Sequence, residues 1–278
     1  MKISIITITY NSEKTLEETI LSVINQKNVD LEYIIVDGQS TDQTMSIVNK
    51  YRDHITKVIS EPDNGISDAF NKGIGLATGD IVGIINSDDM LTQHALEMVQ
   101  NVVEQNPGVD VFYGNSIRFR DDRENYIYKP DNDLHDLLHF MFLSHPSTFV
   151  RRSAYIKYGV FEEKYRMAMD FRLLSKMYRE GAAFRYIDAE LTWFRLDGTS
   201  MKKEEITRAE SVEIAVMNGI DERQARAFYQ RVYRKGRIIA LLERLGVGDL
   251  LRRRIKKQNK AQTPRKWYLT LSVDLDHK

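Results

Sequence analysis

The chain contains no cysteine, and it has no long hydrophobic run. Without cysteine, its 278 residues cannot form disulfides, thiolate nucleophiles or cysteine-based metal sites. No apolar stretch approaches the roughly 18 residues that a membrane-spanning helix requires. The N-terminal MKISIITITYNSE alternates apolar and polar residues and lacks the apolar core of a signal peptide, so it predicts a strand. We therefore expect a cytoplasmic protein.

Two common backbone cradles for phosphate are also missing. The chain has no Gly-x-Gly-x-x-Gly after the first predicted strand and no Gly-x-x-x-x-Gly-Lys-[Ser/Thr]. A bound nucleotide would need another way to neutralise its phosphate charge, and a metal ion is the natural substitute. An excess of one charge is lacking too, because 40 basic residues balance 40 acidic ones. This balance argues against nucleic-acid binding by the chain as a whole.

The first half of the chain alternates strand and helix patterns. Strands are expected at 3–8, 31–37, 54–60, 79–85 and 109–119, and helices at 12–26, 41–51, 65–77 and 91–104, with Ser12 and Thr41 as N-caps. From about residue 134 the alternation stops, with short helices at 134–141, 153–158 and 169–179, a strand at 183–195, and helices at 204–219 and 221–246. The pattern predicts an α/β protein with a mostly parallel sheet, helices on both faces and a helical C-terminal extension.

Polar residues follow the first four predicted strands, at 9–11, 37–40, 61–65 and 86–89. Ligands of such sheets bind beyond the carboxyl ends of the strands, where these clusters would converge. The clusters therefore indicate a polar, nucleotide-sized ligand that carries negative charge.

The stretch GIINSDDML (83–91) places two adjacent carboxylates, Asp88 and Asp89, at the end of the fourth predicted strand. One interpretation is that they cap the following helix, where negative charge is favourable. The other is a divalent cation site, because carboxylate oxygens suit Mg²⁺ or Mn²⁺ and a diphosphate can supply further ligands. The residues by themselves leave both open.

Four motifs occur in a fixed order along the chain: TITYNSE (7–13), IIVDGQSTDQT (34–44), SEPDNGISDAFNKGIGLATGDIVGIINSDDM (60–90) and HPSTFVRRSAYIKYGVFEEKYRMAMDFRLL (145–174). With them the chain resembles the inverting family 2 glycosyltransferases of GT-A fold, such as those of bacterial colanic-acid-type polysaccharide biosynthesis. The resemblance covers roughly residues 1–200. It implies a catalytic domain there, with a nucleotide-binding half at 1–115 and an acceptor-side half at 116–200, before a basic helical extension at 201–278.

The resemblance also implies an activity and a donor site. The enzyme would be a hexosyltransferase that moves a sugar from a nucleotide sugar, expected to be a UDP-sugar, to a hydroxyl of a saccharide or lipid-linked saccharide. Tyr10 would stack on the nucleobase, and Asp37 would accept a hydrogen bond from it, as from uracil N3–H. The other residues expected around the donor are Thr9, Asn11, Asn64, Gly65, Asp68, Asn71, Asn86, Ser87, His145 and Arg195.

The metal and the base follow from the same resemblance. Asp88 would ligate Mn²⁺ or Mg²⁺. Asp89 would belong to the same metal site, where it would either support Asp88 or cap the next helix. Asn86 stands where the family usually has the first Asp of its Asp-x-Asp, which alters the charge at the cation. Asp170 matches the general base that an inverting transfer needs, although an acid at a helix N-terminus is the alternative.

Segment 223–260 is strongly basic and contains only Glu243 and Asp249 as acids. Two interpretations stay open: a solvated helix packed on the catalytic domain, or a peripheral contact with anionic lipid at the inner face of the membrane. For the second, 251–260 is the expected contact. Nucleic acid is not expected as a partner, since few aromatic residues interleave the basic ones. Homo-oligomerisation through these helices also stays open.

Two other functions remain as alternatives. A nucleotidylyltransferase would usually carry a Gly- and Lys/Arg-rich signature after the first strand, where this chain has TYNSEKT. A nucleotide-sugar-binding protein without activity is the second alternative, and the departure at Asn86 is its only support.

Overall fold

The computed structural model describes residues 1–120, 123–130, 133–196 and 204–244. These residues form a mixed sheet of strand order β3-β2-β1-β4-β8-β6-β9-β5, with β7 paired to β6. The strands are β1 (Lys2–Thr9), β2 (Asp30–Asp37), β3 (Lys57–Ser60), β4 (Ile81–Ile84), β5 (Met90–Leu91), β6 (Val111–Arg120), β7 (Arg123–Tyr128), β8 (Thr148–Arg151) and β9 (Phe184–Arg195). The α-helices are α1 (Leu16–Ile24), α2 (Thr44–Lys50), α3 (Ile66–Leu76), α4 (Ala95–Gln105), α5 (Arg152–Tyr158), α6 (Met169–Arg179), α7 (Glu204–Met217) and α8 (Glu222–Arg244), and three 3₁₀ turns are η1 (Arg52–His54), η2 (Leu134–Leu138) and η3 (His145–Ser147).

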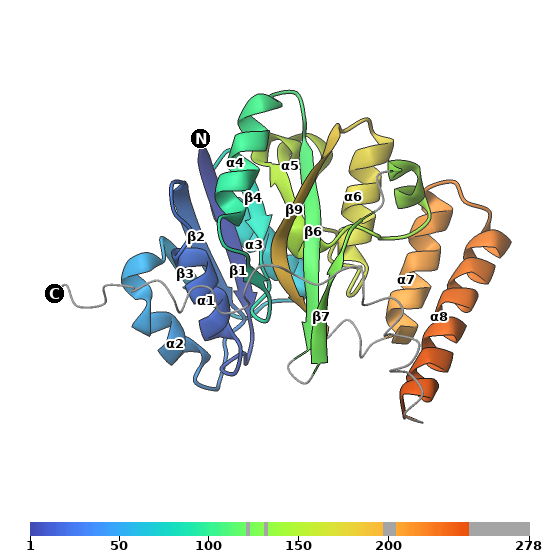
Figure 1. Ribbon diagram of the computed structural model, residues 1–278, viewed down its shortest axis with the longest axis horizontal. Helices are drawn as coiled ribbons and strands as arrows, with labels where there is room; N and C mark the ends of the chain where they lie inside the picture. The colour runs from blue at the N-terminus through green and yellow to red at the C-terminus, as the bar shows by residue number, and fades with distance from the viewer. Residues whose placement is uncertain (121–122, 131–132, 197–203, 245–278) are drawn as a thin grey trace.

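Helices cover both faces of the sheet, and each face has its own core. One core receives side chains from α1, α2 and α4, and the other receives them from α3, α5 and α6. Strand β1 serves both, because Ile5 packs into the first core and its neighbour Ile6 into the second. Figure 1 shows the layers, with α1 and α4 in front of the sheet and α3 behind it. The predicted α/β class with C-terminal helices is confirmed.

The parallel part of the sheet aligns the strand ends that matter for function. β1 pairs with β2 and β2 with β3, so Thr9, Asp37 and Ser60 lie side by side across three strands. β4 flanks β1 on its other side and also runs parallel to it. The carboxyl ends of all four strands therefore meet at one edge of the sheet, the lower edge in Figure 1.

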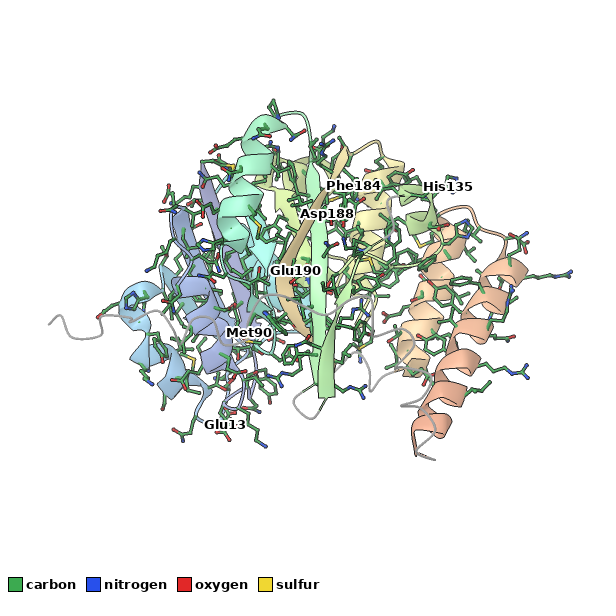
Figure 2. The ribbon with its side chains drawn as sticks, in the orientation of Figure 1. Glu13, Met90, His135, Phe184, Asp188 and Glu190 are labelled. Carbon is green, nitrogen blue, oxygen red and sulfur yellow. The ribbon has the colours of Figure 1, made fainter. Side chains whose placement is uncertain are left out.

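The second half of the sheet departs from the parallel pattern. β8 runs antiparallel to β4, and β6 runs antiparallel to β8 and parallel to β9. At the β4–β8 contact, a Cβ on Gly83 would lie 2.6 Å from the Phe149 ring, so only glycine lets the two strands pair there. Figure 2 labels Phe184 and Glu190 along β9, and Met90 beside the end of that strand, where β5 joins the sheet.

Three expected helix starts are wrong. α1 and α2 begin at Leu16 and Thr44, after N-caps Thr15 and Gln43, so neither Ser12 nor Thr41 caps a helix. Residues Met90–Leu91 form β5, and α4 begins only at Ala95. Pairing of β5 with β9 takes this segment out of the helix, and Asp88 and Asp89 therefore do not cap α4.

The C-terminal helices α7 and α8 pack against each other on the α6 side of the molecule, at the right of Figure 1. In the part of the chain that the structure describes, no helix is both long and apolar enough to cross a membrane. The basic stretch 251–260 lies outside the described residues.

Candidate active site

The end of β1 presents an exposed aromatic ring at the edge of the sheet. Tyr10 is 62% exposed, whereas Thr9 before it is buried. Asn11 turns the chain with a left-handed φ of 48°, and its side-chain oxygen accepts a hydrogen bond of 2.9 Å from the Thr41 N–H. The turn leaves the Tyr10 ring available for stacking. Asn11 lies at the edge, but its side-chain oxygen is engaged with the β2–α2 loop.

Asp37 lies beneath this edge and not on its surface. The residue is 0% exposed, and its carboxylate accepts hydrogen bonds from the Ser40 N–H at 3.0 Å and the Ser60 hydroxyl at 2.6 Å. The Ser40 hydroxyl donates to the same carboxylate. A nucleobase could reach Asp37 only if this network opened. In this structure Asp37 fixes the loop after β2, and its expected contact with the base stays a prediction.

Asp63 is the residue that sequence reasoning missed. Its Oδ1 accepts a hydrogen bond of 2.9 Å from the Gly65 N–H. Its Oδ2 would lie 2.5 Å from a Cβ on Gly38, and the Tyr10 ring would lie 3.4 Å from the same point. A partly exposed carboxylate thus stands beside the stacking ring, with the bare backbone of Gly38 between them. The polar cluster at 61–65 was the signal that could have found it.

The start of α3 is held by charges of its own. Asp68 accepts a hydrogen bond of 2.9 Å from the Asn64 N–H and pairs with Lys72 at 3.2 Å. The Asn64 hydrogen bond, aided by Lys72, lowers the pKa of the Asp68 carboxyl. Gly65 adopts a φ of 117° in open surroundings, and Asn64 is exposed beside it. Asn64 and Gly65 form a rim of the site, whereas Asp68 stabilises the loop that carries them.

Asn71 and His145 fasten the segment before Asp170 to α3. Both side-chain groups of Asn71 bind the Phe161 backbone, at 2.9 Å to its carbonyl and 3.0 Å to its N–H. Asn71 thus holds the Phe161 backbone in this structure, and its expected contact with the donor stays a prediction. The His145 ring packs against Phe70 and Phe161 with centroids 5.2 and 5.8 Å away, and burial lowers the pKa of His145 to about 4. His145 is therefore a neutral packing group at pH 7.

The two acids in the turn after β4, Asp88 and Asp89, have different surroundings. Asp89 is buried, and its carboxylate accepts hydrogen bonds of 2.9 Å from the Arg195 N–H and 3.0 Å from the Asn86 amide. For the Asp88 carboxylate, the described residues provide no hydrogen-bond donor from another residue and no ion pair within contact distance, while burial raises its pKa. The positive charge of Arg195 partly offsets the effect of burial on Asp88, whereas burial and the neighbouring Asp88 charge raise the pKa of Asp89 well above its ordinary value. Asp89 is thus the acid held inside the protein by other residues, and Asp88 is the one whose carboxylate no other described residue binds.

Arg195 supports this turn from β9. Its Nε lies 3.3 Å from the Asp88 carbonyl oxygen, its guanidinium pairs with Glu18 at 3.3 Å, and it stacks over Phe119 at 4.7 Å. The side chain is only 10% exposed. The guanidinium pairs with Glu18 in this structure, and the expected contact between Arg195 and the donor stays a prediction. Ser87, in contrast, reaches the first strand end through a 2.9 Å contact with the Ser12 hydroxyl.

Asp170 occupies the first turn of α6. Its Oδ1 accepts a hydrogen bond of 2.7 Å from the Phe171 N–H, yet burial outweighs this bond and raises the pKa of Asp170 to about 6. A solvated acid at a helix N-terminus would have a lowered pKa instead. A carboxyl with a pKa of about 6 is still mostly ionised at pH 7, and it is a stronger proton acceptor than an ordinary carboxylate. Both properties suit a general base.

The segment before Asp170 reaches the same edge as the strand ends. The Ser67 hydroxyl, at the start of α3, donates a hydrogen bond of 3.0 Å to the Tyr165 carbonyl. Asn71 and His145 add the contacts to Phe161 described above. The stacking ring of Tyr10, the turn of Asp88 and the helix start of Asp170 therefore lie toward one edge of the sheet, although α6 packs on the face opposite α1.

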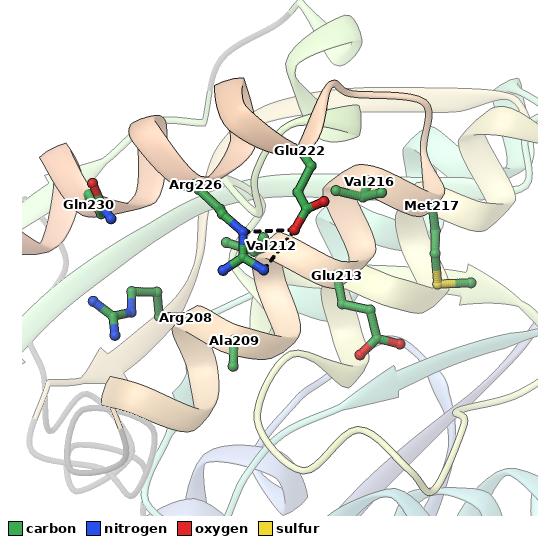
Figure 3. Close-up of a pocket in the computed structure, with 9 residues that line it drawn as sticks. All are labelled: Arg208, Ala209, Val212, Glu213, Val216, Met217, Glu222, Arg226 and Gln230. Carbon is green, nitrogen blue, oxygen red and sulfur yellow. Dashed lines mark hydrogen bonds and ion pairs between the residues drawn. The ribbon is translucent and has the colours of Figure 1, made fainter.

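A separate hollow lies between α7 and α8. It measures about 510 Å³ and is lined by Arg208, Ala209, Val212, Glu213, Val216, Met217, Glu222, Arg226 and Gln230. Figure 3 shows the ion pair of Arg226 with Glu222 across its rim. All these lining residues belong to the C-terminal helices, so this hollow is distinct from the site at the strand ends.

Comparison with known proteins identifies the family to which the chain belongs. Residues 4–159, more than half of the chain, match the family model "Glycosyl transferase family 2". A "PGL/p-HBAD biosynthesis glycosyltransferase" of Mycobacterium bovis is 30% identical over 172 residues, which cover 60% of this chain and 66% of the relative. An "Uncharacterized glycosyltransferase" of Nostoc is 33% identical over 116 residues, which cover 41% of this chain and 36% of the relative. The chain thus spans less than two thirds of the length of both relatives.

Solved structures show the same fold. The S. aureus TarS structure in complex with UDP-GlcNAc is 21% identical, with a TM-score of 0.64 over 81% of this chain and 69% of that one. The mannosyltransferase PcManGT from Pyrobaculum calidifontis, in complex with GDP-Man and Mn²⁺, is 17% identical, with a TM-score of 0.59 over 90% of this chain and 78% of that one. The chain belongs to glycosyl transferase family 2, and its expected GT-A fold is confirmed.

Proposed function

We propose that the chain is a metal-dependent inverting glycosyltransferase. It moves a sugar from a nucleoside-diphosphate sugar to a hydroxyl of a saccharide or lipid-linked saccharide in cell-surface polysaccharide biosynthesis. The observation that carries the proposal is Asp170, a carboxylate at the start of α6 whose pKa burial raises to about 6, toward the same edge of the sheet as the strand ends and Asp88.

Asp170 acts as the base in this proposal. The acceptor hydroxyl gives its proton to the Asp170 carboxylate while the acceptor oxygen forms a bond to the anomeric carbon of the donor. The bond between that carbon and the diphosphate oxygen breaks, and the nucleoside diphosphate leaves with the bonding electrons. One displacement inverts the anomeric configuration, and it requires no nucleophile from the protein.

The residues present fit a divalent cation at Asp88. Its carboxylate is a hard oxygen ligand. The carboxylate is partly buried, burial raises its pKa, and no other described residue donates a hydrogen bond to it. The described residues contain no group of three or more His, Asp or Glu that could hold a metal by themselves, so donor oxygens would complete the coordination. When bound, Mn²⁺ or Mg²⁺ would neutralise the charge that develops on the leaving diphosphate.

Tyr10 and Asp63 are the proposed contacts to the nucleobase. Tyr10 offers an exposed ring for stacking, and the Asp63 carboxylate lies beside it to accept a hydrogen bond from a base N–H. We favour UDP as the nucleotide. Uracil presents one such N–H at N3, whereas guanine presents donors at two positions. The bound donors of the two solved neighbours, UDP-GlcNAc and GDP-Man, are the first two to compare.

A panel of nucleotide sugars tests the proposal. The chain is incubated with each of UDP-GlcNAc, UDP-glucose, UDP-galactose and GDP-mannose, with Mn²⁺ or with EDTA, and the released nucleotide is identified by chromatography. We expect release of a nucleoside diphosphate from one donor, and loss of that release in EDTA. Release of a nucleoside monophosphate and pyrophosphate chemistry would support a nucleotidylyltransferase instead, and binding without turnover would support an inactive binding protein.

The proposal places the enzyme at the inner face of the membrane. Four arginines of α8, namely Arg223, Arg226, Arg231 and Arg234, are exposed. Such side chains suit anionic headgroups, each contributing about 1 kcal/mol near the surface. Co-sedimentation with vesicles of 30% phosphatidylglycerol should exceed that with pure phosphatidylcholine and should fall with salt. Equal sedimentation with both would contradict this part of the proposal.

A further inference from the structure

Glu210 of α7 binds three consecutive backbone N–H groups just before Asp170. Its Oε1 accepts a hydrogen bond of 2.8 Å from the Arg166 N–H. Its Oε2 accepts bonds of 2.9 Å from the N–H groups of both Met167 and Ala168. The carboxylate of a C-terminal helix thus holds the backbone that leads into the first turn of α6.

This contact lies immediately before α6, at its N-cap residue Ala168 and the two residues that precede it. Ala168 is the N-cap of α6 and has no side chain that could accept a hydrogen bond from the first turn. The N-terminal N–H groups of a helix need outside acceptors, and a negative charge there is favourable. Glu210 places a negative charge near this end and accepts the hydrogen bond of the N-cap N–H, so the position of the α6 start depends on α7.

Other contacts fix α7 to the same segment. Glu213, one turn further along α7, accepts hydrogen bonds of 3.0 Å from both the Tyr165 hydroxyl and the Lys164 ammonium. Arg179, at the end of α6, donates to the Met217 carbonyl at the end of α7. The helix is therefore held at two levels along its length, and Glu210 cannot move independently of the α6 start.

We propose that Glu210 is a positioning residue for the base, holding the backbone of 166–168 so that Asp170 faces the reacting hydroxyl. The inference rests on the proposed function of Asp170, and it makes the C-terminal helices part of the catalytic apparatus. Misplacement of a reacting group by about 1 Å can cost on the order of 10²-fold in rate, which is the scale of effect expected here.

The charge of Glu210 affects the pKa of Asp170, so the contact between α7 and the start of α6 can be followed in the pH dependence of the reaction. Glu210 carries negative charge near Asp170 and contributes to the raised pKa of that carboxyl. Three ion pairs lie on the neighbouring elements: Arg172 with Glu162 at 2.8 Å, Asp68 with Lys72 at 3.2 Å, and Lys164 with Glu213 at 3.0 Å. His145 is neutral because burial lowers its pKa to about 4.

The test compares E210A and E210Q with the wild type, using whichever donor of the panel the wild type turns over. The matched control is E205Q, because Glu205 is exposed on the same helix. For each variant, kcat and the donor KM are measured between pH 4.5 and 8, UDP binding is measured by calorimetry, and thermal unfolding reports folding. D170N is measured beside them.

In E210A we expect kcat to fall about 10²-fold while donor KM and UDP affinity stay near wild type. In E210Q the loss is smaller, because the amide oxygen still accepts hydrogen bonds. The acidic limb of its rate profile moves to lower pH, since the charge that raised the pKa of Asp170 is gone. E205Q should match the wild type in all respects.

Wild-type kcat and an unmoved acidic limb in folded E210A would overturn the inference. Loss of UDP binding in E210Q would overturn it too, because Glu210 would then support the whole fold and not the base. If D170N itself transfers sugar at the wild-type rate, the proposed base is wrong. If D170N is inactive while E210A is fully active, only the role of Glu210 fails.

Discussion

The side-chain amide of Asn86 donates a hydrogen bond of 3.0 Å to the carboxylate of Asp89. This hydrogen bond gives the two adjacent acids of the turn different roles. It holds the Asp89 carboxylate in the protein interior, whereas Asp88 is the acid that we propose as the ligand of the cation. It also accounts for asparagine at position 86. A carboxylate there would face Asp89 inside the protein, and two like charges at that distance repel each other strongly.

The first prediction concerns N86D. The new carboxylate removes the hydrogen bond to Asp89 and places a like charge beside it, so the free energy of unfolding should fall by about 1–3 kcal/mol. Urea denaturation at pH 7.5 measures the change, with N86A as the control that removes the amide without adding charge. If N86D unfolds like the wild type and binds Mn²⁺ with UDP more tightly, Asn86 is a weakened metal ligand and not a partner of Asp89.

The second prediction contrasts D88N with D89N. No other described residue donates a hydrogen bond to the Asp88 carboxylate, so the D88N protein should be as stable as the wild type. It should lose the Mn²⁺-dependent part of UDP binding. Turnover should fall by roughly 10²-fold or more, because the charge on the leaving group is no longer neutralised. Calorimetry with UDP, with and without Mn²⁺, measures the binding.

In D89N the amide nitrogen would face the Asn86 amide or the Arg195 N–H, both of which are donors. We therefore expect D89N to lose about 1–3 kcal/mol of unfolding free energy. The opposite pattern, with D88N unstable and D89N deficient only in metal-dependent binding, would show that the two roles have been exchanged.

The third prediction uses the raised pKa of Asp170. The carboxylate must be ionised to accept a proton, so turnover should fall as pH drops through about 6. Because the folded-state pKa lies above the unfolded value, the folded state binds more protons between about pH 4 and 6, and ionised Asp170 lowers stability at pH 7. D170N removes this cost and should unfold with up to about 3 kcal/mol more free energy at pH 7.

At pH 4 the difference in stability between the D170N variant and the wild type should shrink to below about 1 kcal/mol, because Asp170 is then protonated in the folded state and only partly ionised in the unfolded state. Denaturation at the two pH values measures the difference. A D170N variant that is less stable than the wild type at pH 7 would show that the carboxylate supports the fold, as a simple helix-terminal acid does.

The fourth prediction concerns the nucleobase. Tyr10 is 62% exposed, so Y10A should change the free energy of unfolding by no more than about 0.5 kcal/mol. Loss of one base–aromatic stack should weaken UDP binding by about 1–3 kcal/mol. Y10F keeps the ring and should bind UDP like the wild type. Equal affinities of Y10A and Y10F would remove Tyr10 from the base site.

Much of the fold follows from local patterns in the sequence. The β-branched runs of β1, β2 and β4 alternate with amphipathic helices, and that alternation predicts parallel pairing. The second half was harder, because β8 and β5 are only a few residues long and depend on partners distant in the chain. Leu91 and the residues after it show helical periodicity, yet pairing of β5 with Trp193 and Thr192 of β9 outweighs that local preference.

The site was predictable in location but not in the direction of its side chains. The strand-end motifs correctly pointed to one edge, since that follows from the parallel order of β1 to β4. Asp37, Asn71 and Arg195 each bind partners within the protein that the strand-end motifs did not predict. Such pairings join residues far apart in sequence, and the same is true of Glu210 and the backbone before Asp170.

The most direct test of the proposed mechanism is the D170N variant, measured for both binding and turnover. UDP affinity in the presence of Mn²⁺ is determined by calorimetry, and release of nucleoside diphosphate from the active donor is followed with acceptor present. We predict wild-type affinity together with a loss of turnover of at least about 10²-fold, the scale of general-base catalysis. Turnover close to wild type in the folded variant would contradict the assignment of Asp170 as the base.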